Sequence, residues 1–412
     1  MRISSSQYFN LNVASMSDQQ STLASMYQQI SSGKRIMTAS DDPLGAAQAV
    51  QLTMQGNALT QYGTNQTKAL SSLQQEDSTL SDVSDVMQSI KTKLVQAGDG
   101  SLTDANRSAI ANAIQGYRDQ LMNIANTTDS DGNYIFSGLK GGTQPYTNNP
   151  SGVGATYSGD AGQRTVQISA GRSIAVGDPG QSIFGSVSPT ESAPVSSAAA
   201  TNTGTGTISG VSVSDPSNPN NGSTYTIQFA VDATAGTTSY TVTAVPADSS
   251  LPTTPTAYTG SADITLGGQK VSVAGAPGNG DSFTVQPATA GNNDIFATLD
   301  NLVSALKQPT GSDSAHAALT NALTTAGTKI TNTFNNVLAA QTVVGGREQQ
   351  IQSTQTAMQT TQTQNASDLA NLTQIDLVSS ISSYELTQNS LQAAQMAFTQ
   401  IQKMSLFDYL GG

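Results

Sequence analysis

Apolar residues recur at a seven-residue step toward both ends of this chain, and this repeat constrains the fold more than any other feature. Near the N-terminus the residues on this step are Phe9, Met16, Leu23, Ile30 and Met37. A second register runs from Leu52 to Leu94, and a third runs from Leu323 to Met358. Such a step is typical of helices that pack along a narrow seam. A narrow seam builds no core by itself, so each helix needs a partner. We therefore predict that the two ends of the chain pair with each other.

The third register contains two glycines that would normally end a helix. The seven-residue step nevertheless continues across Gly345 and Gly346, from Val344 to Ile351. We predict one continuous helix there, with a weak point at the glycines. A further apolar stripe reaches the end of the chain and comprises Leu377, Ile381, Tyr384, Leu391, Ala394, Phe398 and Ile401.

The middle of the chain, from Gly138 to about Asn293, has the opposite character. It is rich in Gly, Pro, Thr and Ser, and it contains short alternating runs such as "RTVQISA", "STYTIQFAV", "TTSYTVTAV" and "DSFTVQ". Turn residues separate these runs, which is typical of an all-β insert built from hairpins. Residues 186–222 are interpreted as loop or linker, although "GTISGVSVSD" within them could supply a strand.

These patterns predict an α+β multidomain protein. Both chain ends form a long antiparallel helical bundle or coiled coil, and an all-β domain is inserted in the middle. We predict a terminal coiled-coil domain from 1–40 and 371–412, and a helical rod domain from 41–139 and 295–370. The β-rich insert is predicted over 140–294.

The composition excludes several classes of function. The 412 residues include no Cys, so disulfides and thiolate metal sites are ruled out. The net charge of −12 disfavours nucleic acid and anionic membranes as partners. No stretch approaches the ~20 apolar residues of a membrane span, and the N-terminus lacks the apolar core of a secretory signal peptide. We expect a soluble protein that would leave the cell, if it does, by another route.

Two short motifs raise the alternative of a secreted serine esterase. "GDSF" at 280–283 and "DSAH" at 313–316 supply Ser282, Asp313 and His316, which could form a catalytic triad. However, Ser282 alternates with Phe283 as it would in a strand, and Asp313 is placed as the N-cap of a helix. Short motifs remain hypotheses until their structural context agrees. The interpretation as strand and cap is favoured, and no catalytic residue is predicted.

The stretch "ISSGKRIMTASDDPLG", from Ile30 to Gly45, is predicted to join two helices. A glycine suits the position that ends the first helix, and the basic residues after it complement a helix C-terminus. An aspartate can cap the second helix, with proline in its first turn. The predicted hinge comprises Gly33, Lys34, Arg35, Asp41, Asp42 and Pro43. The two aspartates have no His, Cys or further carboxylate nearby, so we predict no metal site and no cofactor.

Both ends of the chain resemble the flagellin family. "QISSGKRIMTASDDPLGAA" at 29–47 resembles the N-terminal signature of that family, and "DLVSSISSYELTQNSLQAAQMAFTQIQKMSLFDYL" at 376–410 resembles its terminal helix. In the middle, "GNYIFSGLKGGTQPY" at 132–146 and "TYSGDAGQRTVQISAGRSIAVGDPGQSIFG" at 156–185 are similar to the branch whose members join the flagellar hook to the filament.

This resemblance implies a structural, non-enzymatic role at the bacterial flagellum. It implies export by the flagellar type III apparatus, an extracellular location, and a homo-oligomeric ring between a neighbouring hook-associated junction protein and flagellin. It also implies a cytoplasmic export chaperone at the C-terminal helix. The residues expected to form the assembly seam are Phe9, Met16, Leu23, Ile30, Met37, Leu391, Phe398 and Ile401. A filament-forming flagellin is the alternative within the same family.

Overall fold

The computed structural model describes residues 5–150, 152–189 and 192–410, with the side chains of residues 7–400 inside those ranges. The chain forms two compact units. The first comprises Met1–Thr64 with Ser353–Gly412, and the second comprises Asn65–Gln352. Each unit therefore contains segments from both sides of the predicted insert.

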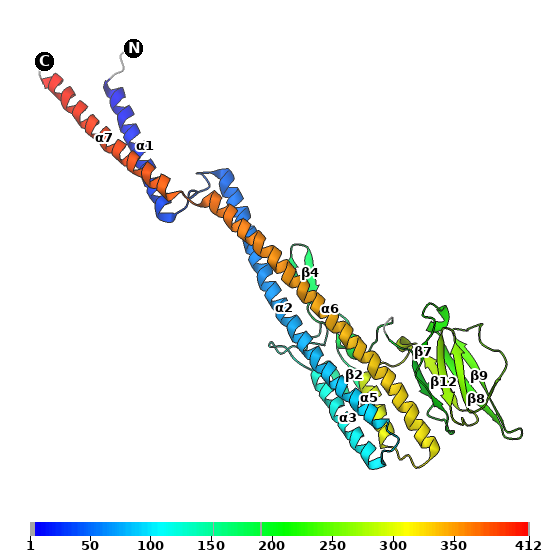
Figure 1. Ribbon diagram of the computed structural model, residues 1–412. Helices are drawn as coiled ribbons and strands as arrows, with labels where there is room; N and C mark the ends of the chain where they lie inside the picture. Colours follow the sequence, from blue (N-terminus) through cyan, green and yellow to red (C-terminus); the bar gives the residue numbers. More distant parts are fainter. Residues whose placement is uncertain (1–4, 151, 190–191, 411–412) are drawn as a thin grey trace. The chain divides into compact units, whose positions relative to one another are not determined.

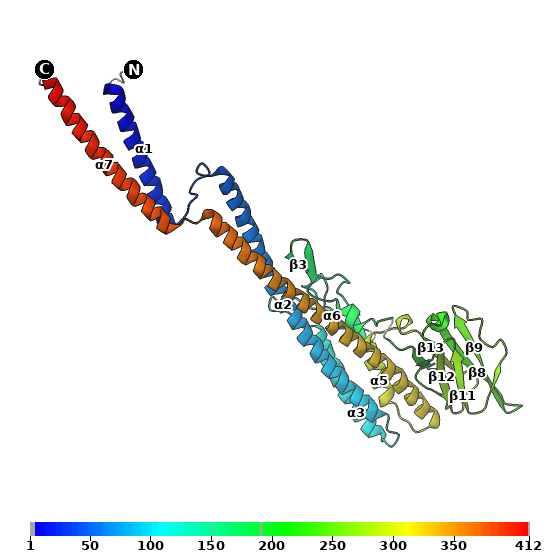
Figure 2. The same cartoon turned by 45° about the horizontal axis from the view of Figure 1, so that its top comes forward.

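Two antiparallel helices from the chain ends dominate the first unit. Helix α1 (Ser5–Ser32) lies beside helix α7 (Leu377–Leu410), with both chain ends at the same end of the pair (Figure 1 and Figure 2). The rings of Phe9 and Phe398 meet with centroids 5.2 Å apart. Each helix thus supplies the partner that the seam of the other needs, as the sequence predicts.

Two longer helices begin or end in the first unit and continue into the second. Helix α2 spans Pro43–Ala97, and helix α6 spans Asp313–Thr373. Helix α6 runs without interruption through Gly345 and Gly346, which confirms the prediction of one continuous helix. In the second unit Gly327 of α6 lies against Leu94 of α2, so these two helices pack directly there.

A hydrophobic core lies between the helices of the second unit. Helix α3 (Asp104–Ala125) and helix α5 (Ile295–Lys307) pack together with α2 and α6. Thr103 caps α3 by accepting from the backbone N–H of Asn106, and Asp294 caps α5 by accepting from that of Phe296. The fully buried side chains include Leu73, Leu80, Met87, Ile90, Ile114, Leu121, Phe296, Leu299, Ile330 and Val337.

Two short hairpins and one short helix pack onto this helical core. They are β1 (Tyr146–Asn148) with β2 (Ala155–Tyr157), β3 (Thr165–Ser169) with β4 (Arg172–Ala175), and α4 (Gly180–Phe184). The ring of Tyr146 lies 5.3 Å from that of Phe296 and 5.6 Å from that of Phe184. These aromatic residues complete the core beside α5.

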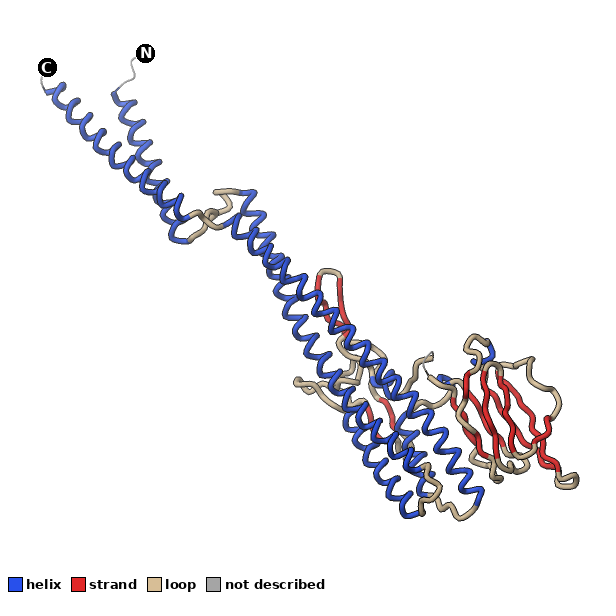
Figure 3. The backbone as a smooth tube through the Cα atoms, viewed as in Figure 1, coloured by secondary structure: helices blue, strands red, loops and turns tan. Residues whose placement is uncertain are grey.

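The remaining strands form a separate β-rich part with its own core (Figure 3). They are β5 (Val195–Ala198), β6 (Thr207–Ile208), β7 (Ser212–Val213), β8 (Thr224–Asp232), β9 (Thr237–Val245), β10 (Thr256–Tyr258), β11 (Ser261–Leu266), β12 (Gln269–Ala274) and β13 (Ser282–Gln286). One sheet has the order β10-β9-β8-β13-β5, and a second contains β11, β12 and β6 with β7 beside β12. All pairs in both sheets are antiparallel.

The structure agrees with the predicted fold class but not with every predicted domain boundary. The α+β class with helical ends and a β-rich middle is confirmed. However, the single insert predicted over 140–294 is divided, because residues 146–184 pack into the helical core while 195–286 form the second core. The segment 186–222, interpreted as linker, contains β5, β6 and β7. Within the described ranges, no helix combines the length and hydropathy that a membrane span requires.

Candidate assembly surface

The first unit leaves many large apolar side chains exposed. We call the following residues the terminal apolar surface: Tyr8, Phe9, Leu11, Val13 and Tyr27 of α1, Leu44, Val50 and Met54 of α2, and Leu377, Val378, Ile381, Leu386 and Met396 of α7. Among the side chains described in this unit, Leu391 is the one hydrophobic residue that is buried, with 8% exposed. An apolar surface of this extent marks a site of protein–protein contact.

The predicted seam lies mostly between α1 and α7 of the same chain. Leu391 is buried, and Met16, Leu23, Ile30 and Phe398 are partly buried. These five residues thus lie where α1 and α7 of one chain pack together. The side chain of Ile401 lies outside the described residues.

Met37 does not belong to the seam. Helix α1 ends at Ser32, so the seven-residue step runs past the end of the helix. Met37 lies in the following linker, is largely exposed, and accepts a hydrogen bond on its sulfur from the Ser32 hydroxyl at 3.0 Å. The prediction that Met37 continues the seam is therefore wrong.

Several exposed residues were missed by the sequence reasoning because they lie off the seven-residue step. Leu11, Leu386 and Met396 are examples, and each is more exposed than the seam residues on its own helix. In the sequence, each of these residues could have been recognised only as an isolated apolar residue on an otherwise polar helix face. Taken singly, such residues are common on protein surfaces and need no explanation.

The linker between α1 and α2 is bound to the linker between α6 and α7. Gly33 adopts φ 68°, the left-handed conformation that ends a helix and suits glycine. Lys34 then forms an antiparallel bridge with Gln374. The Arg35 N–H donates to the Thr373 carbonyl at 2.7 Å. The two connections of the first unit are therefore held side by side by their backbones.

Arg35 complements a different helix from the one predicted. Its guanidinium donates to the Leu372 carbonyl at 3.0 Å, in the last turn of α6, and lies 3.3 Å from the Asp42 carboxylate. The sequence places Arg35 just after α1, which suggested that its charge favours the end of that helix. Because the linker after α1 lies beside the end of α6, Arg35 instead reaches the carbonyl groups at the C-terminus of α6.

The adjacent aspartates organise the start of α2. Asp41 accepts from the backbone N–H groups of Thr38 at 2.8 Å and Met37 at 3.0 Å, and these bonds lower the pKa of its carboxyl. Asp42 accepts from the N–H of Gly45 at 2.9 Å, which lowers the pKa of Asp42 more than Arg35 does. Helix α2 begins at Pro43, so Asp42 occupies the capping position. Nowhere in the described chain do His, Asp or Glu gather as a metal would require.

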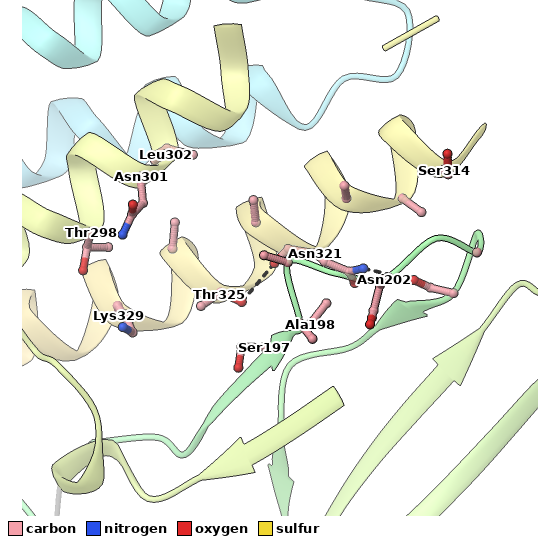
Figure 4. A pocket seen from close by; sticks show the side chains of 18 residues that line it. Ser197, Ala198, Asn202, Thr298, Asn301, Leu302, Ser314, Asn321, Thr325 and Lys329 are labelled. Atoms are coloured by element: carbon pink, nitrogen blue, oxygen red, sulfur yellow. Dashed lines mark hydrogen bonds between the residues drawn. The ribbon is translucent and has the colours of Figure 1, made fainter. Parts of the chain in front are cut away.

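The residues of the esterase alternative gain no support. The Ser282 N–H, at the start of β13, donates to the Asn202 side chain at 2.9 Å. His316 is exposed in the first turns of α6, and the only hydrogen bonds described for it are made by its backbone. In the described part of the chain, no hydrogen bond joins the side chains of Ser282, Asp313 and His316. A cavity of about 440 Å³ between β5, α5 and α6 is lined by none of the three (Figure 4).

The same view shows how the β-rich part is held on α6. Asn321 accepts from the Ile208 N–H at 2.8 Å and donates to the Gly206 carbonyl at 3.0 Å. One turn later Thr325 donates to the Ser196 carbonyl at 2.8 Å. Asn332 bonds both backbone groups of Ala193, at 2.9 and 2.8 Å. Sequence reasoning missed these residues, since polar side chains on a helix usually face solvent.

Known proteins share this arrangement. Residues 3–140 match the family described as bacterial flagellin N-terminal helical region. The flagellar hook-associated protein 3 of Escherichia coli strain K12 is 27% identical over 410 residues, which is 99% of each chain. This chain is thus similar to flagellar hook-associated protein 3 over nearly the whole of both sequences. The flagellar junction protein FlgL from Legionella pneumophila has a solved structure that is 28% identical, with a TM-score of 0.66, and covers 79% of this chain and 99% of that one.

The similarity to flagellin is shorter than the similarity to hook-associated protein 3. The flagellin of the same Escherichia coli strain is 28% identical over 205 residues, which is 50% of this chain and 39% of the flagellin. Its percentage identity is close to that of hook-associated protein 3, but the latter alignment covers 99% of each chain. The resemblance to the flagellin family noted from the sequence is therefore confirmed.

Proposed function

We propose that this chain is a structural, non-enzymatic component of the bacterial flagellum that joins the hook to the filament. One observation carries the proposal: the similarity to hook-associated protein 3 covers 99% of this chain, whereas the similarity to flagellin covers 50% of it. The function of a fold is set by its surfaces rather than by its class. The terminal apolar surface is the feature of this chain best suited to assembly.

The proposed mechanism is burial of the terminal apolar surface between subunits. In a single chain these side chains remain in water. Burying apolar surface stabilises an interface by about 25 cal/mol per Å², and a closed ring repeats the same contact at every subunit. The partners are further copies of this chain, a hook-associated junction protein on the hook side, and flagellin on the filament side.

The proposal includes the route out of the cell. The chain is exported by the flagellar type III apparatus and functions outside the cell. Before export, a cytoplasmic chaperone covers the C-terminal helix. The exposed Leu386 and Met396 of α7 support that partner, because an unshielded apolar helix promotes aggregation.

Immunogold labelling of purified hook–filament complexes tests the proposal. An antibody against the β-rich part, residues 195–286, should label one band where the hook meets the filament. Labelling along the whole filament would instead assign the chain as a flagellin. Absence of label from the complexes, with the protein present in the same culture, would contradict both assignments. A strain lacking the gene provides the control for antibody specificity.

A further inference from the structure

A buried carboxyl group in the second unit lacks a partner for one of its oxygens. Glu76 of α2 is 0% exposed. Its Oε1 accepts from the Asp178 N–H at 2.8 Å. Its Oε2 has no hydrogen-bond donor among the described residues. An ionised carboxylate in this position would be a buried charge with half of its hydrogen bonds missing, which is costly.

The nearest cation is already engaged by another carboxylate. Arg347 of α6 donates to both oxygens of Asp178, at 3.1 and 3.0 Å. Asp178 is 7% exposed and also accepts from Gln163. This guanidinium therefore pairs with Asp178 through two hydrogen bonds and acts on Glu76 only through its charge. Two acids in this relation share a site in which one of them stays protonated.

The remaining charged groups around Glu76 do not supply a partner. Arg164 is directed toward Asp129, with 3.9 Å between the charged atoms. Two further acidic residues of these helices are Asp77, next to Glu76 on α2, and Glu348 on α6. Burial first, and then the charge of Asp77, raise the pKa of Glu348. The charges of Arg347 and Arg164 favour the ionised form of Glu76, but burial and the charge of Asp178 outweigh them.

Asp178 belongs to residues 163–187, which we call the covering segment. This segment contains β3, β4 and α4, and it packs Ile168, Ile174, Ile183 and Phe184 into the helical core. Its hydrogen bond to Glu76 is a direct link to α2 at this point. The Arg347–Asp178 pair is its link to α6, immediately after Gly345 and Gly346.

We propose that Glu76 is a proton-controlled latch, whose neutral acid form holds the covering segment on α2 and whose ionised form loosens it. The bond from the Asp178 N–H favours the ionised form, but burial and the negative charge of Asp178 oppose it more strongly. Ionisation places a second negative charge beside Asp178 and draws Arg347 away from its bidentate contact. The inference concerns the second unit and does not depend on the proposed function. Burial, followed by the charge of Asp178, raises the pKa of Glu76 to about 7, so the change falls near neutral pH.

The direction with pH follows from the raised pKa. The closed form binds the proton more tightly than the open form, in which Glu76 has the ordinary value of 4.5. Closure is therefore strongest below about pH 4.5 and is lost as the pH rises through about 7. Between these limits the opening equilibrium grows by at most about tenfold per pH unit.

Carboxyl-carbon NMR measures the latch directly in the unmodified protein. The sequence holds four Glu residues, so side-chain 13C labelling of Glu gives four titrating signals. The Glu76→Gln variant identifies the signal of Glu76 by its disappearance. That signal should titrate near pH 7 in the wild-type chain. Titration near 4.5 would overturn the proposal, even if the variant itself failed to fold.

Amide hydrogen exchange tests the consequence for the covering segment. After correction for intrinsic rates, protection of residues 163–187 in the full chain should fall by up to about a hundredfold between pH 5 and pH 8. In Glu76→Gln the protection should be the same at both pH values. Asp82→Asn, which removes an exposed charge of α2, is the matched control and should behave like wild type. A pH-independent wild type, or an unchanged pH dependence in Glu76→Gln, would overturn the latch.

Discussion

The two units begin from the same kind of sequence and reach different degrees of burial. In the first unit, α1 and α7 pack along one seam and leave most of their apolar residues exposed. In the second, α2 and α6 carry a similar seven-residue step, but Leu73, Leu80, Ile330 and Val337 are fully buried. The difference comes from a third layer, because α3, α5 and residues 146–184 cover the second pair. A seven-residue repeat of apolar residues therefore predicts a helix pair. The elements that pack on the pair determine how much of its apolar surface is buried.

The largest expected effect comes from introducing a charged residue into the first unit and comparing it with the same change in the second unit. Leu386→Asp lies on the terminal apolar surface, and Val245→Asp lies in the β-rich part at nearly the same exposure, 74% against 75%. A buried unpaired charge costs more than about 1.4 kcal/mol, so Leu386→Asp should reduce incorporation into hook–filament complexes by at least about tenfold. Quantitative immunoblotting of purified complexes measures incorporation. Equal incorporation of both variants would remove the functional distinction between the units.

A core truncation should distinguish the units in the monomer. Leu80→Ala removes a fully buried side chain of the second unit and should lower the free energy of unfolding by about 2–5 kcal/mol. Leu23→Ala removes a partly buried seam residue of the first unit and should cost less than about 1 kcal/mol. Urea unfolding of monomeric protein, followed by far-UV circular dichroism, compares them. Similar losses in both variants would show that the first unit has a core of its own.

A buried aspartate should make the β-rich part of the second unit sensitive to acid. Asp281 is 3% exposed and accepts from the backbone N–H groups of Thr203 at 2.8 Å, Gly204 at 3.0 Å and Gly278 at 2.7 Å. Burial alone would raise its pKa, but these bonds together hold the pKa below 3.8. The stabilisation is therefore present above about pH 4 and is lost as the pH falls through the folded value.

Asp281→Asn should cost about 1–3 kcal/mol, because an amide nitrogen would face backbone donors. Tyrosine fluorescence reports this unfolding, since Tyr225 and Tyr258 are buried in the same core. The exposed Asp263→Asn is the control and should change stability much less, because water screens the pair that Asp263 forms with Lys270. If Asp281→Asn were as stable as that control, the hydrogen bonds of Asp281 would contribute nothing measurable.

The smallest effect concerns the paired linkers of the first unit. Arg35→Ala removes the side-chain bond to Leu372 and the exposed pair with Asp42, and its effect on stability should be small because water screens exposed pairs. Faster amide exchange at residues 33–42, with unchanged exchange in the second unit, is the expected result. Arg35→Gln keeps a donor for the Leu372 carbonyl, so its amide exchange rates should lie between those of the wild type and of Arg35→Ala. A change that spread into the core of α2 and α6 would show that the units are more tightly coupled than their burial suggests.

Local features of the fold could be predicted from the sequence. The seven-residue step identified the long helices, and alternation identified β3, β4, β8, β9 and β13. Gly33 and Asp42 end and begin helices as their chemistry predicts. Each of these depends on residues that are neighbours in the chain, so a short window of sequence contains the required information.

Contacts between distant residues could not be predicted in this way. Arg35 binds Leu372, which is 337 residues away, and nothing near Arg35 indicates that partner. The insert is divided because Tyr146 and Phe184 meet Phe296, again at long range. Most of the terminal apolar surface escaped notice for a related reason. Whether Leu386 is covered depends on which elements pack on α7, and not on the residues beside it.

The contact between α6 and the β-rich part imposes unequal constraints on its two sides. Asn321, Thr325 and Asn332 bind only main-chain atoms of residues 193–208. On α6 the side chains are restricted, because these bonds need an amide at residues 321 and 332 and a hydroxyl at residue 325. On the opposite side any residue other than proline presents the same backbone groups. The insert is therefore free to diverge in sequence while its place of attachment is retained, so one helical body could carry many different outer domains.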